Sequence, residues 1–194
     1  FEAQDWPDKE LVVVETYHTR PSEFFAELAR REPHRLAYVS FQRPAGQDWS
    51  IGLKRNIGAA VATGEFIANF DDDDIYAPAY LATMLEHLQR QDALGVTLSS
   101  WYVYDSASGG VGYSNPGIEA NMRWMDEDVT AENVRKWTYG YGFSYVHRRQ
   151  AVLDVPYEDI GLGEDYRFFS ELLRRHGEGA IALLEDRLGV CLHT

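Results

Sequence analysis

The chain has 194 residues, of which 31 are Asp or Glu and 18 are Lys or Arg, so its formal net charge is −13 at pH 7. An acidic surface repels phosphate backbones and anionic headgroups, which disfavours a general nucleic-acid-binding or membrane-surface protein. The hydrophobic fraction of 45% supports a packed core and argues against disorder. A single cysteine, Cys191, excludes an intrachain disulfide framework and a zinc-cysteine cluster.

The length suits a single domain that covers residues 1–194. The sequence has no apolar run of the roughly 18 residues needed to span a membrane, and no signal peptide is visible. We therefore expect a cytoplasmic protein with no membrane span in this chain.

The first half of the chain alternates strand and helix. Short, mostly apolar runs predict strands at residues 11–14, 36–41, 66–70 and 96–104. Helical spacing of apolar residues, after Ser22, Ser50 and Pro78, predicts helices at residues 22–32, 50–63 and 79–91. This alternation predicts a largely parallel sheet with helices on its faces.

The second half is less regular. We predict a hairpin loop at residues 106–110 and a turn at residues 115–117. Helices are expected at residues 129–137 and 163–176, and strands at residues 141–147, 181–184 and 188–192.

Four consecutive aspartates, residues 71–74, directly follow the strand expected at residues 66–70. Ligands of open α/β sheets bind beyond the carboxyl ends of the strands. Asp71 and Asp73 are spaced as Asp-x-Asp, so one carboxylate can bind a hard cation such as Mn²⁺ or Mg²⁺ while another holds a metal-bound water or a ribose hydroxyl. The alternative for such a charge run is a solvated acidic turn.

Three other stretches are candidates for chemistry. Residues 54–58 combine basic side chains with Asn56 and a glycine, which suits a phosphate or nucleotide, although a solvated helix face has the same composition. Glu164 and Asp165 follow two glycines at a predicted helix start, where Asp165 is either a general base or an N-terminal cap. His193 is a candidate metal ligand, although a single terminal His more often has no such role.

Aromatic residues concentrate in the second half of the chain. Most are expected in the core, and Trp137 and Tyr139 are the candidates for a platform on which a sugar ring stacks. The group comprises Trp101, Tyr102, Tyr104, Trp124, Trp137, Tyr139, Tyr141 and Phe143.

Six short motifs follow one another along the chain. They lie at residues 4–14, 55–67, 71–78, 143–149, 163–166 and 188–193. In this order they resemble six motifs of the family 2 glycosyltransferases with the GT-A fold. Those motifs are Q-x-[YW]-P…E-[LI]-[IV]-V-V, R-N-x-G…A-x-G-[ED]-[YF]-I, D-x-D-D…P, an acceptor-side strand ending in R-R, G-E-D, and a terminal strand ending in His. The resemblance covers nearly the whole chain.

The resemblance implies a Rossmann-like α/β fold of the GT-A type, with a mixed, mostly parallel central sheet flanked by helices. It implies a nucleotide-binding half at residues 1–95 and an acceptor-binding half at residues 96–194. The expected reaction moves a sugar from a nucleotide-diphosphate sugar, with a UDP-sugar favoured, to a glycan or other hydroxyl acceptor. A divalent metal, Mn²⁺ or Mg²⁺, and inversion at the anomeric carbon are implied as well.

The resemblance also implies roles for individual residues. The general base would be Asp165, with Glu164 beside it as a second catalytic residue. The donor nucleotide would lie near Glu15, Arg55, Asn56, Asp71 and Asp72. The metal would lie near Asp71, Asp73 and His193, and the acceptor near Trp137 and Tyr139.

Two departures from the family pattern stand out. The first strand of the family, which contributes to the nucleotide pocket, is absent here. At residues 15–18 the family usually has D-D-G-S, in which an Asp contacts the base, so Glu15 is the expected substitute. These departures leave open a glycosyltransferase-like module that binds a sugar or a partner without catalysis. A haloacid-dehalogenase-like phosphatase with Asp71 as nucleophile is a weaker alternative, because Ile75 stands where its motif has Thr or Val.

Overall fold

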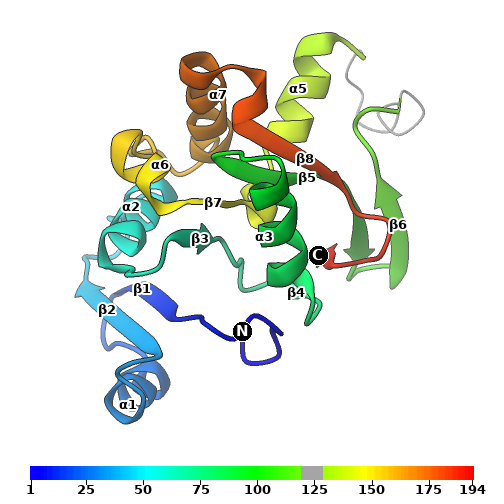
Figure 1. Ribbon diagram of the computed structural model, residues 1–194. Helices are drawn as coiled ribbons and strands as arrows, with labels where there is room; N and C mark the ends of the chain where they lie inside the picture. Colours follow the sequence, from blue (N-terminus) through cyan, green and yellow to red (C-terminus); the bar gives the residue numbers. More distant parts are fainter. Residues whose placement is uncertain (119–128) are drawn as a thin grey trace.

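The computed structural model describes residues 1–118 and 129–194, which form an α/β fold (Figure 1). Its elements, with η for a 3-10 helical turn, are β1 (Leu11–Tyr17), α1 (Glu23–Arg31), β2 (Leu36–Gln42), α2 (Ile51–Val61), β3 (Phe66–Ala68), β4 (Ile75–Tyr76), α3 (Tyr80–Arg90), β5 (Gly95–Asp105), β6 (Gly110–Ser114), α5 (Ala131–Tyr139), η2 (Gly142–Ser144), β7 (Val146–Arg148), α6 (Arg149–Asp154), α7 (Glu164–His176), η3 (Glu178–Ala180), β8 (Ile181–Glu185) and β9 (Cys191–His193).

A seven-stranded mixed sheet occupies the centre. Its hydrogen-bonded path is β3-β7-β5-β9-β4, and β6 and β8 also pair with β5. Strands β8 and β9 run parallel to β5, whereas the pairs β3–β7, β5–β7, β4–β9 and β5–β6 are antiparallel. The predicted mixed sheet with flanking helices is confirmed, and its parallel share is smaller than predicted because β6 and β7 run against β5.

Helices cover both faces of this sheet. Consecutive strand residues point to opposite faces, and here they join different cores. Val146 of β7 and Ala182 of β8 pack with α3, whereas their neighbours Tyr145 and Ile181 pack with α6 and α7. The apolar stripe predicted for residues 79–91 is therefore confirmed as the cover of one face. No described helix is both long enough and apolar enough to cross a lipid bilayer.

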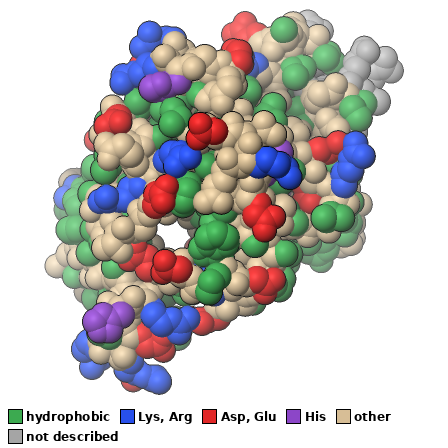
Figure 2. Space-filling model, in the orientation of Figure 1, with side chains coloured by type: hydrophobic (Ala, Val, Ile, Leu, Met, Phe, Trp, Pro, Cys, Tyr) green, Lys and Arg blue, Asp and Glu red, His purple; other side chains and the backbone are tan. Residues whose placement is uncertain are grey.

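Strands β1 and β2 form a separate two-stranded parallel sheet. All seven residues of β1 are half-buried and α1 has no buried residue, so this unit packs more loosely than the main sheet. Within residues 1–118 and 129–194, β1 pairs with β2 alone and β3 with β7 alone. Figure 2 shows an opening in the molecule between the β1–β2 unit and the main sheet, with acidic side chains on its rim.

Local signals explain most element starts. Ser22 and Ser50 cap α1 and α2 as predicted, because their Oγ atoms accept the N–H groups of Phe25 and Leu53.

The predicted strand at residues 141–147 is wrong over its first part. Residues 142–144 form η2, and only Val146–Arg148 pairs as a strand, because the turn bonds to other elements described below. The short helix α6 was not predicted.

Candidate active site

Arg55 stands at the centre of a cluster of charged side chains. It projects from α2, and its Nη1 donates to Glu164 Oε1 at 2.7 Å. Its Nη2 lies 3.9 Å from Asp71 Oδ1, and its guanidinium covers the Tyr157 ring at 5.5 Å from the ring centre. The Arg55 side chain is 15% exposed. A buried guanidinium thus joins the loop after β3 to the start of α7.

Glu164 is committed to this ion pair. Its side chain is only 5% exposed. Burial raises the pKa of the Glu164 carboxyl, and the Arg55 charge acts in the opposite direction. Since the carboxylate faces Arg55, it holds the guanidinium in place. The catalytic role expected for Glu164 stays a prediction.

Asp165 lies in the first turn of α7, after Gly163, whose φ of 81° requires the left-handed conformation that glycine adopts freely. Its Oδ2 accepts the backbone N–H of Gly142 at 2.8 Å, and its Oδ1 accepts the N–H of Tyr166. A carboxylate oxygen has two acceptor positions, so each oxygen keeps capacity for a further proton donor.

Gly142 is packed too tightly for any side chain. An added Cβ would lie 2.7 Å from Arg55 Nη1 and 2.9 Å from Asp165 Cβ. The turn η2, which this residue opens, therefore contacts both charged side chains directly. Gly142 was not among the predicted site residues, although two glycines set among aromatic residues at positions 139–143 were a signal for a close approach.

Asp71 is connected to the same turn from its other side. Its N–H donates to the Tyr76 hydroxyl oxygen at 3.0 Å, and that hydroxyl donates to the Phe143 carbonyl at 2.9 Å. Burial raises the pKa of the Asp71 carboxyl, and the Arg55 guanidinium opposes this shift. Asp72 and Asp73 are exposed, as ligands of a bound substrate require.

Asp74 and His193 form a second pair at the edge of the cluster. His193 Nδ1 lies 2.9 Å from Asp74 Oδ1, which also accepts the N–H of Thr194 at 2.9 Å. The imidazole stacks on the Phe143 ring, with ring centres 4.5 Å apart and planes 10° from parallel. His193 thus lies beside the turn that contacts Asp165.

The predicted metal ligands were Asp71, Asp73 and His193. Among the described residues, no group of three or more His, Cys, Asp or Glu side chains is arranged to hold a metal ion by itself. However, His193 bonds to Asp74 and the Thr194 hydroxyl donates to the Asp73 carbonyl, so His193 lies beside the aspartate run. Mg²⁺ and Mn²⁺ sites in phosphate-transfer enzymes commonly use one or two carboxylates and complete the shell with substrate phosphates. Carboxylates with one imidazole fit Mn²⁺ in such a shared site.

Asn56 is used by the fold. Its Nδ2 donates to the Tyr157 carbonyl at 2.8 Å, and its Oδ1 accepts the Tyr157 N–H at 2.9 Å. Both ends of the amide hold the loop before α7 against α2. These bonds give Asn56 a structural role, and the donor contact expected for it stays a prediction.

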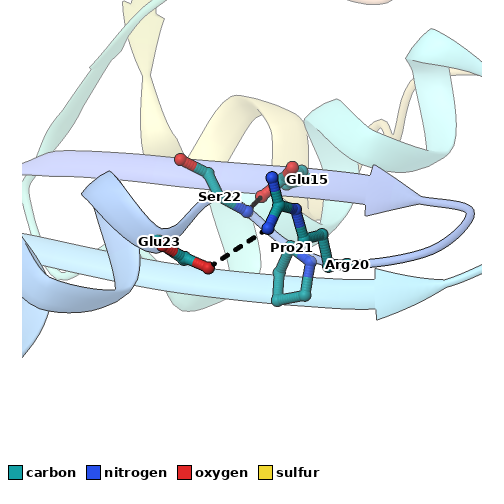
Figure 3. A pocket seen from close by; sticks show the side chains of 5 residues that line it. All are labelled: Glu15, Arg20, Pro21, Ser22 and Glu23. Carbon is teal, nitrogen blue, oxygen red and sulfur yellow. Dashed lines mark hydrogen bonds and ion pairs between the residues drawn. The ribbon is translucent and has the colours of Figure 1, made fainter.

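Glu15 lies beside a cavity of about 270 Å³ at the carboxyl end of β1 (Figure 3). Its Oε2 accepts the N–H of Ser22 at 3.0 Å and the Tyr38 hydroxyl. Across the cavity the Arg20 guanidinium lies 3.6 Å from Glu23 Oε1. A carboxylate and a guanidinium thus line an open cavity at the strand end predicted to contact the nucleotide.

The two aromatic candidates have different environments. Trp137 is half-buried and stacks on Tyr141, with ring centres 5.7 Å apart and planes 26° from parallel. Tyr139 is 7% exposed within the core that α7 covers, and Arg135 lies over its ring. This burial corrects the expectation that Tyr139 contacts the acceptor. Trp124 lies outside the described residues.

Two relatives are similar to parts of this chain. An uncharacterized glycosyltransferase of Nostoc sp. strain PCC 7120 is 34% identical over 95 residues, which cover 48% of this chain and 28% of that protein. Glycosyltransferase GlyG of Streptococcus pneumoniae serotype 4 is 26% identical over 106 residues, which cover 55% of this chain and 34% of that protein.

Solved structures are similar over almost the whole chain. TarS residues 1–349 of S. aureus in complex with UDP has a TM-score of 0.66 at 20% identity and covers 99% of this chain and 53% of its own. Glucosyl-3-phosphoglycerate synthase of Mycobacterium tuberculosis, in complex with Mn²⁺, UDP-glucose and phosphoglyceric acid, has a TM-score of 0.59 at 17% identity and covers 95% and 60%. These similarities establish the GT-A fold.

The chain spans less than two thirds of each of these four proteins. The model of the family described as "Glycosyl transferase family 2" matches residues 1–151, which include β1, the aspartate run and η2. The chain therefore belongs to glycosyl transferase family 2.

Proposed function

We propose that this chain is the donor-binding and catalytic part of a metal-dependent inverting glycosyltransferase. The donor is a nucleoside-diphosphate sugar, with a UDP-sugar favoured, and the acceptor is a hydroxyl group of a glycan or another molecule. The observation that carries the proposal is the contact of Asp165 with the η2 turn, whose other contacts are Arg55, Asp71 through Tyr76, and His193.

In this proposal Asp165 is the general base. The acceptor hydroxyl donates its proton to a carboxylate oxygen of Asp165 as the acceptor oxygen attacks the anomeric carbon. The bond from that carbon to the diphosphate oxygen breaks, and its electron pair leaves with the diphosphate. Attack opposite the leaving group inverts the anomeric configuration.

The exposed carboxylates Asp73 and Asp72, with Asp71 and His193, would hold a divalent ion and the donor. A bound ion neutralises the developing charge of the diphosphate leaving group. The exposure of Asp73 and the electrostatic neighbourhood of Asp71 support this assignment. Mn²⁺ is favoured over Mg²⁺ because an imidazole belongs to the proposed ligand set.

Glu15 is proposed to contact the base from the cavity at the end of β1. Its Oε2 is held by the Ser22 N–H and the Tyr38 hydroxyl, which fixes the carboxylate at the cavity, where it would accept an N–H from a base. Trp137, stacked on Tyr141, is retained as the acceptor-side candidate.

The test is calorimetric titration of UDP and GDP, with and without Mn²⁺, followed by donor hydrolysis. We expect Mn²⁺-dependent binding of UDP that is lost in Asp73→Ala and kept in Glu86→Ala, which removes an exposed carboxylate from α3. Tight binding without any hydrolysis or transfer would favour the alternative, a module that binds sugar nucleotides without catalysis. Absence of nucleotide binding by the folded protein would refute the proposal.

A further inference from the structure

We propose that Asp74 is a positioning residue for His193, and that it directs the His193 Nε2 atom toward the metal. This inference rests on the proposed function and adds a residue that the ligand set Asp71, Asp73 and His193 does not include. It follows from the contacts of the imidazole and from the burial of the carboxylate.

The hydrogen bond defines which ring nitrogen is available. Asp74 Oδ1 accepts the N–H of Thr194 at 2.9 Å, so this oxygen acts as an acceptor. His193 Nδ1 lies 2.9 Å from the same oxygen and must therefore carry the proton that it donates. Because Nδ1 faces Asp74, Nε2 is the ring nitrogen left to ligate a metal.

The ring plane is fixed as well. Phe143 stacks on the imidazole at 4.5 Å, and Tyr141 meets it edge-on with ring centres 6.1 Å apart. The Thr194 hydroxyl also donates to the Asp73 carbonyl, which holds the chain beside His193 against the aspartate run. Asp74 sets the rotation of the ring in a position that its neighbours already restrict.

Asp74 cannot easily be a ligand itself. Its side chain is 0% exposed, whereas that of His193 is 30% exposed. Its Oδ2 is buried and has no hydrogen-bond partner among the described residues. A buried carboxylate oxygen without a partner is costly. A charged hydrogen bond to a metal-binding imidazole gives a reason for keeping a carboxylate here, because such partners orient the ring and increase its basicity.

The experiment measures Mn²⁺ binding by electron paramagnetic resonance of the free ion, with and without UDP. We expect Asp74→Asn to weaken Mn²⁺ binding by about 10- to 100-fold, the usual effect of removing a carboxylate behind a ligating His. Asn keeps the Oδ1 acceptor for both the Thr194 N–H and the His193 ring N–H, so the variant removes the negative charge behind the ring while the anchor of the chain end is preserved.

Two comparisons separate positioning from other roles. In a His193→Ala background, Asp74→Asn should change the Mn²⁺ Kd by no more than about twofold, the usual error of additivity, because Asp74 acts through the ring. An undiminished effect there would make Asp74 a direct ligand and overturn the inference. The matched control is Asp186→Asn. Asp186 is also buried and accepts the N–H groups of residues 188–191, up to the first residue of β9, so it reports the cost of loosening this segment without touching His193.

A second measurement needs no variant. The ¹⁵N shifts of the His193 ring in the wild-type protein should show a protonated Nδ1 and a bare Nε2; the opposite tautomer would overturn the inference.

If the wild-type protein binds Mn²⁺ and Asp74→Asn binds it equally well, the inference fails and the proposed function stands. If the wild-type protein with UDP binds no Mn²⁺, the metal requirement of the proposed function fails and the inference fails with it.

Discussion

The backbone N–H of Gly142 donates to Asp165 Oδ2 at 2.8 Å, and no side chain fits at Gly142. The proposed base is thus positioned by a main-chain group, and the same turn contacts Arg55 and stacks Phe143 on His193. A single turn of three residues couples the proposed base to the proposed metal ligand. The proposed roles of Asp165, Arg55 and His193 therefore depend on the backbone of η2.

Gly142→Ala tests this dependence. The new methyl group would lie within 3 Å of both Arg55 and Asp165, so one of them must move. We expect sugar transfer to fall by about 100-fold or more, the order of loss caused by a misplacement of about 1 Å. Stability should fall by about 1–3 kcal/mol, as in other overpacked positions.

The control for this substitution is Gly112→Ala on β6, where an added Cβ meets nothing within 4 Å. It should leave transfer unchanged. Equal activity of the two variants, measured by release of the nucleoside diphosphate, would contradict a positioning role for the η2 backbone.

The Arg55–Glu164 pair predicts a strong coupling between two residues 109 positions apart. Arg55→Met leaves the Glu164 carboxylate buried without its partner, which typically costs about 3–5 kcal/mol. Glu164→Gln in addition should recover part of that loss, because the buried charge is then removed. The measurement is a double-mutant cycle of urea unfolding.

The exposed pair Arg174–Glu171 is the matched comparison, for which we expect a much weaker coupling, as is usual for a surface ion pair. A coupling of the same size for Arg55 and Glu164 would show that water screens both pairs and that the proposed site is open to solvent at this point.

His147 predicts the pH dependence of stability. It is buried, its Nε2 lies 3.2 Å from the Tyr157 hydroxyl, and its Nδ1 lies 3.2 Å from the Arg148 carbonyl. Burial lowers the pKa of His147 to about 4, from an ordinary value of 6.5. The unfolded chain then binds a proton that the folded protein excludes, so this residue destabilises the fold progressively as pH falls from 6.5 to 4.

The expected loss from His147 over that range is roughly 3 kcal/mol, at 1.36 kcal/mol per unit of pKa shift. His147→Gln, whose amide can keep one donor and one acceptor, should flatten the decrease in unfolding free energy between pH 6.5 and 4. Urea titrations at several pH values measure this slope, and an unchanged slope in the variant would assign the acid sensitivity to other groups.

Sequence reasoning succeeded where short-range signals suffice. The caps Ser22 and Ser50 and the apolar stripe of α3 depend on spacings of three or four residues, which any reader of the sequence can count. The neighbourhood of Asp71 and Asp165 came from the resemblance to the family. The alternation at residues 141–147 misled, because the hydrogen bonds that this turn makes with Asp165 and Tyr76 override a local strand preference.

Contacts between distant residues could not be predicted. Asp74 and His193 are 119 positions apart, and nothing in their local sequence assigns one to the other. Asn56 is a second example, since nothing in its local sequence indicates that its amide bonds the backbone of Tyr157. Polar groups in a cleft serve either the fold or the ligand, and only their partners tell which.

Gln4 gives the last prediction, because it caps a helix from far along the chain. Pro78 precedes α3, and its N-cap residue Ala79 has no side chain that can accept a hydrogen bond. Gln4 is 4% exposed, and its Oε1 accepts the Leu81 N–H at 3.0 Å while its Nε2 donates to the Ala77 carbonyl at 2.8 Å.

Gln4→Ala removes this cap and leaves the Leu81 N–H without its partner, whereas the Ala77 carbonyl still accepts the Tyr80 N–H. We expect a loss of about 1–3 kcal/mol in the free energy of unfolding, the usual cost of such groups. Gln4→Glu keeps the acceptor for Leu81 but places a carboxylate against the Ala77 carbonyl, so it should destabilise as well. Gln91→Ala, at the opposite end of α3 and exposed, is the control and should change stability by less than about 0.5 kcal/mol. If Gln4→Ala is as stable as this control in urea unfolding, the start of α3 does not depend on the N-terminal segment.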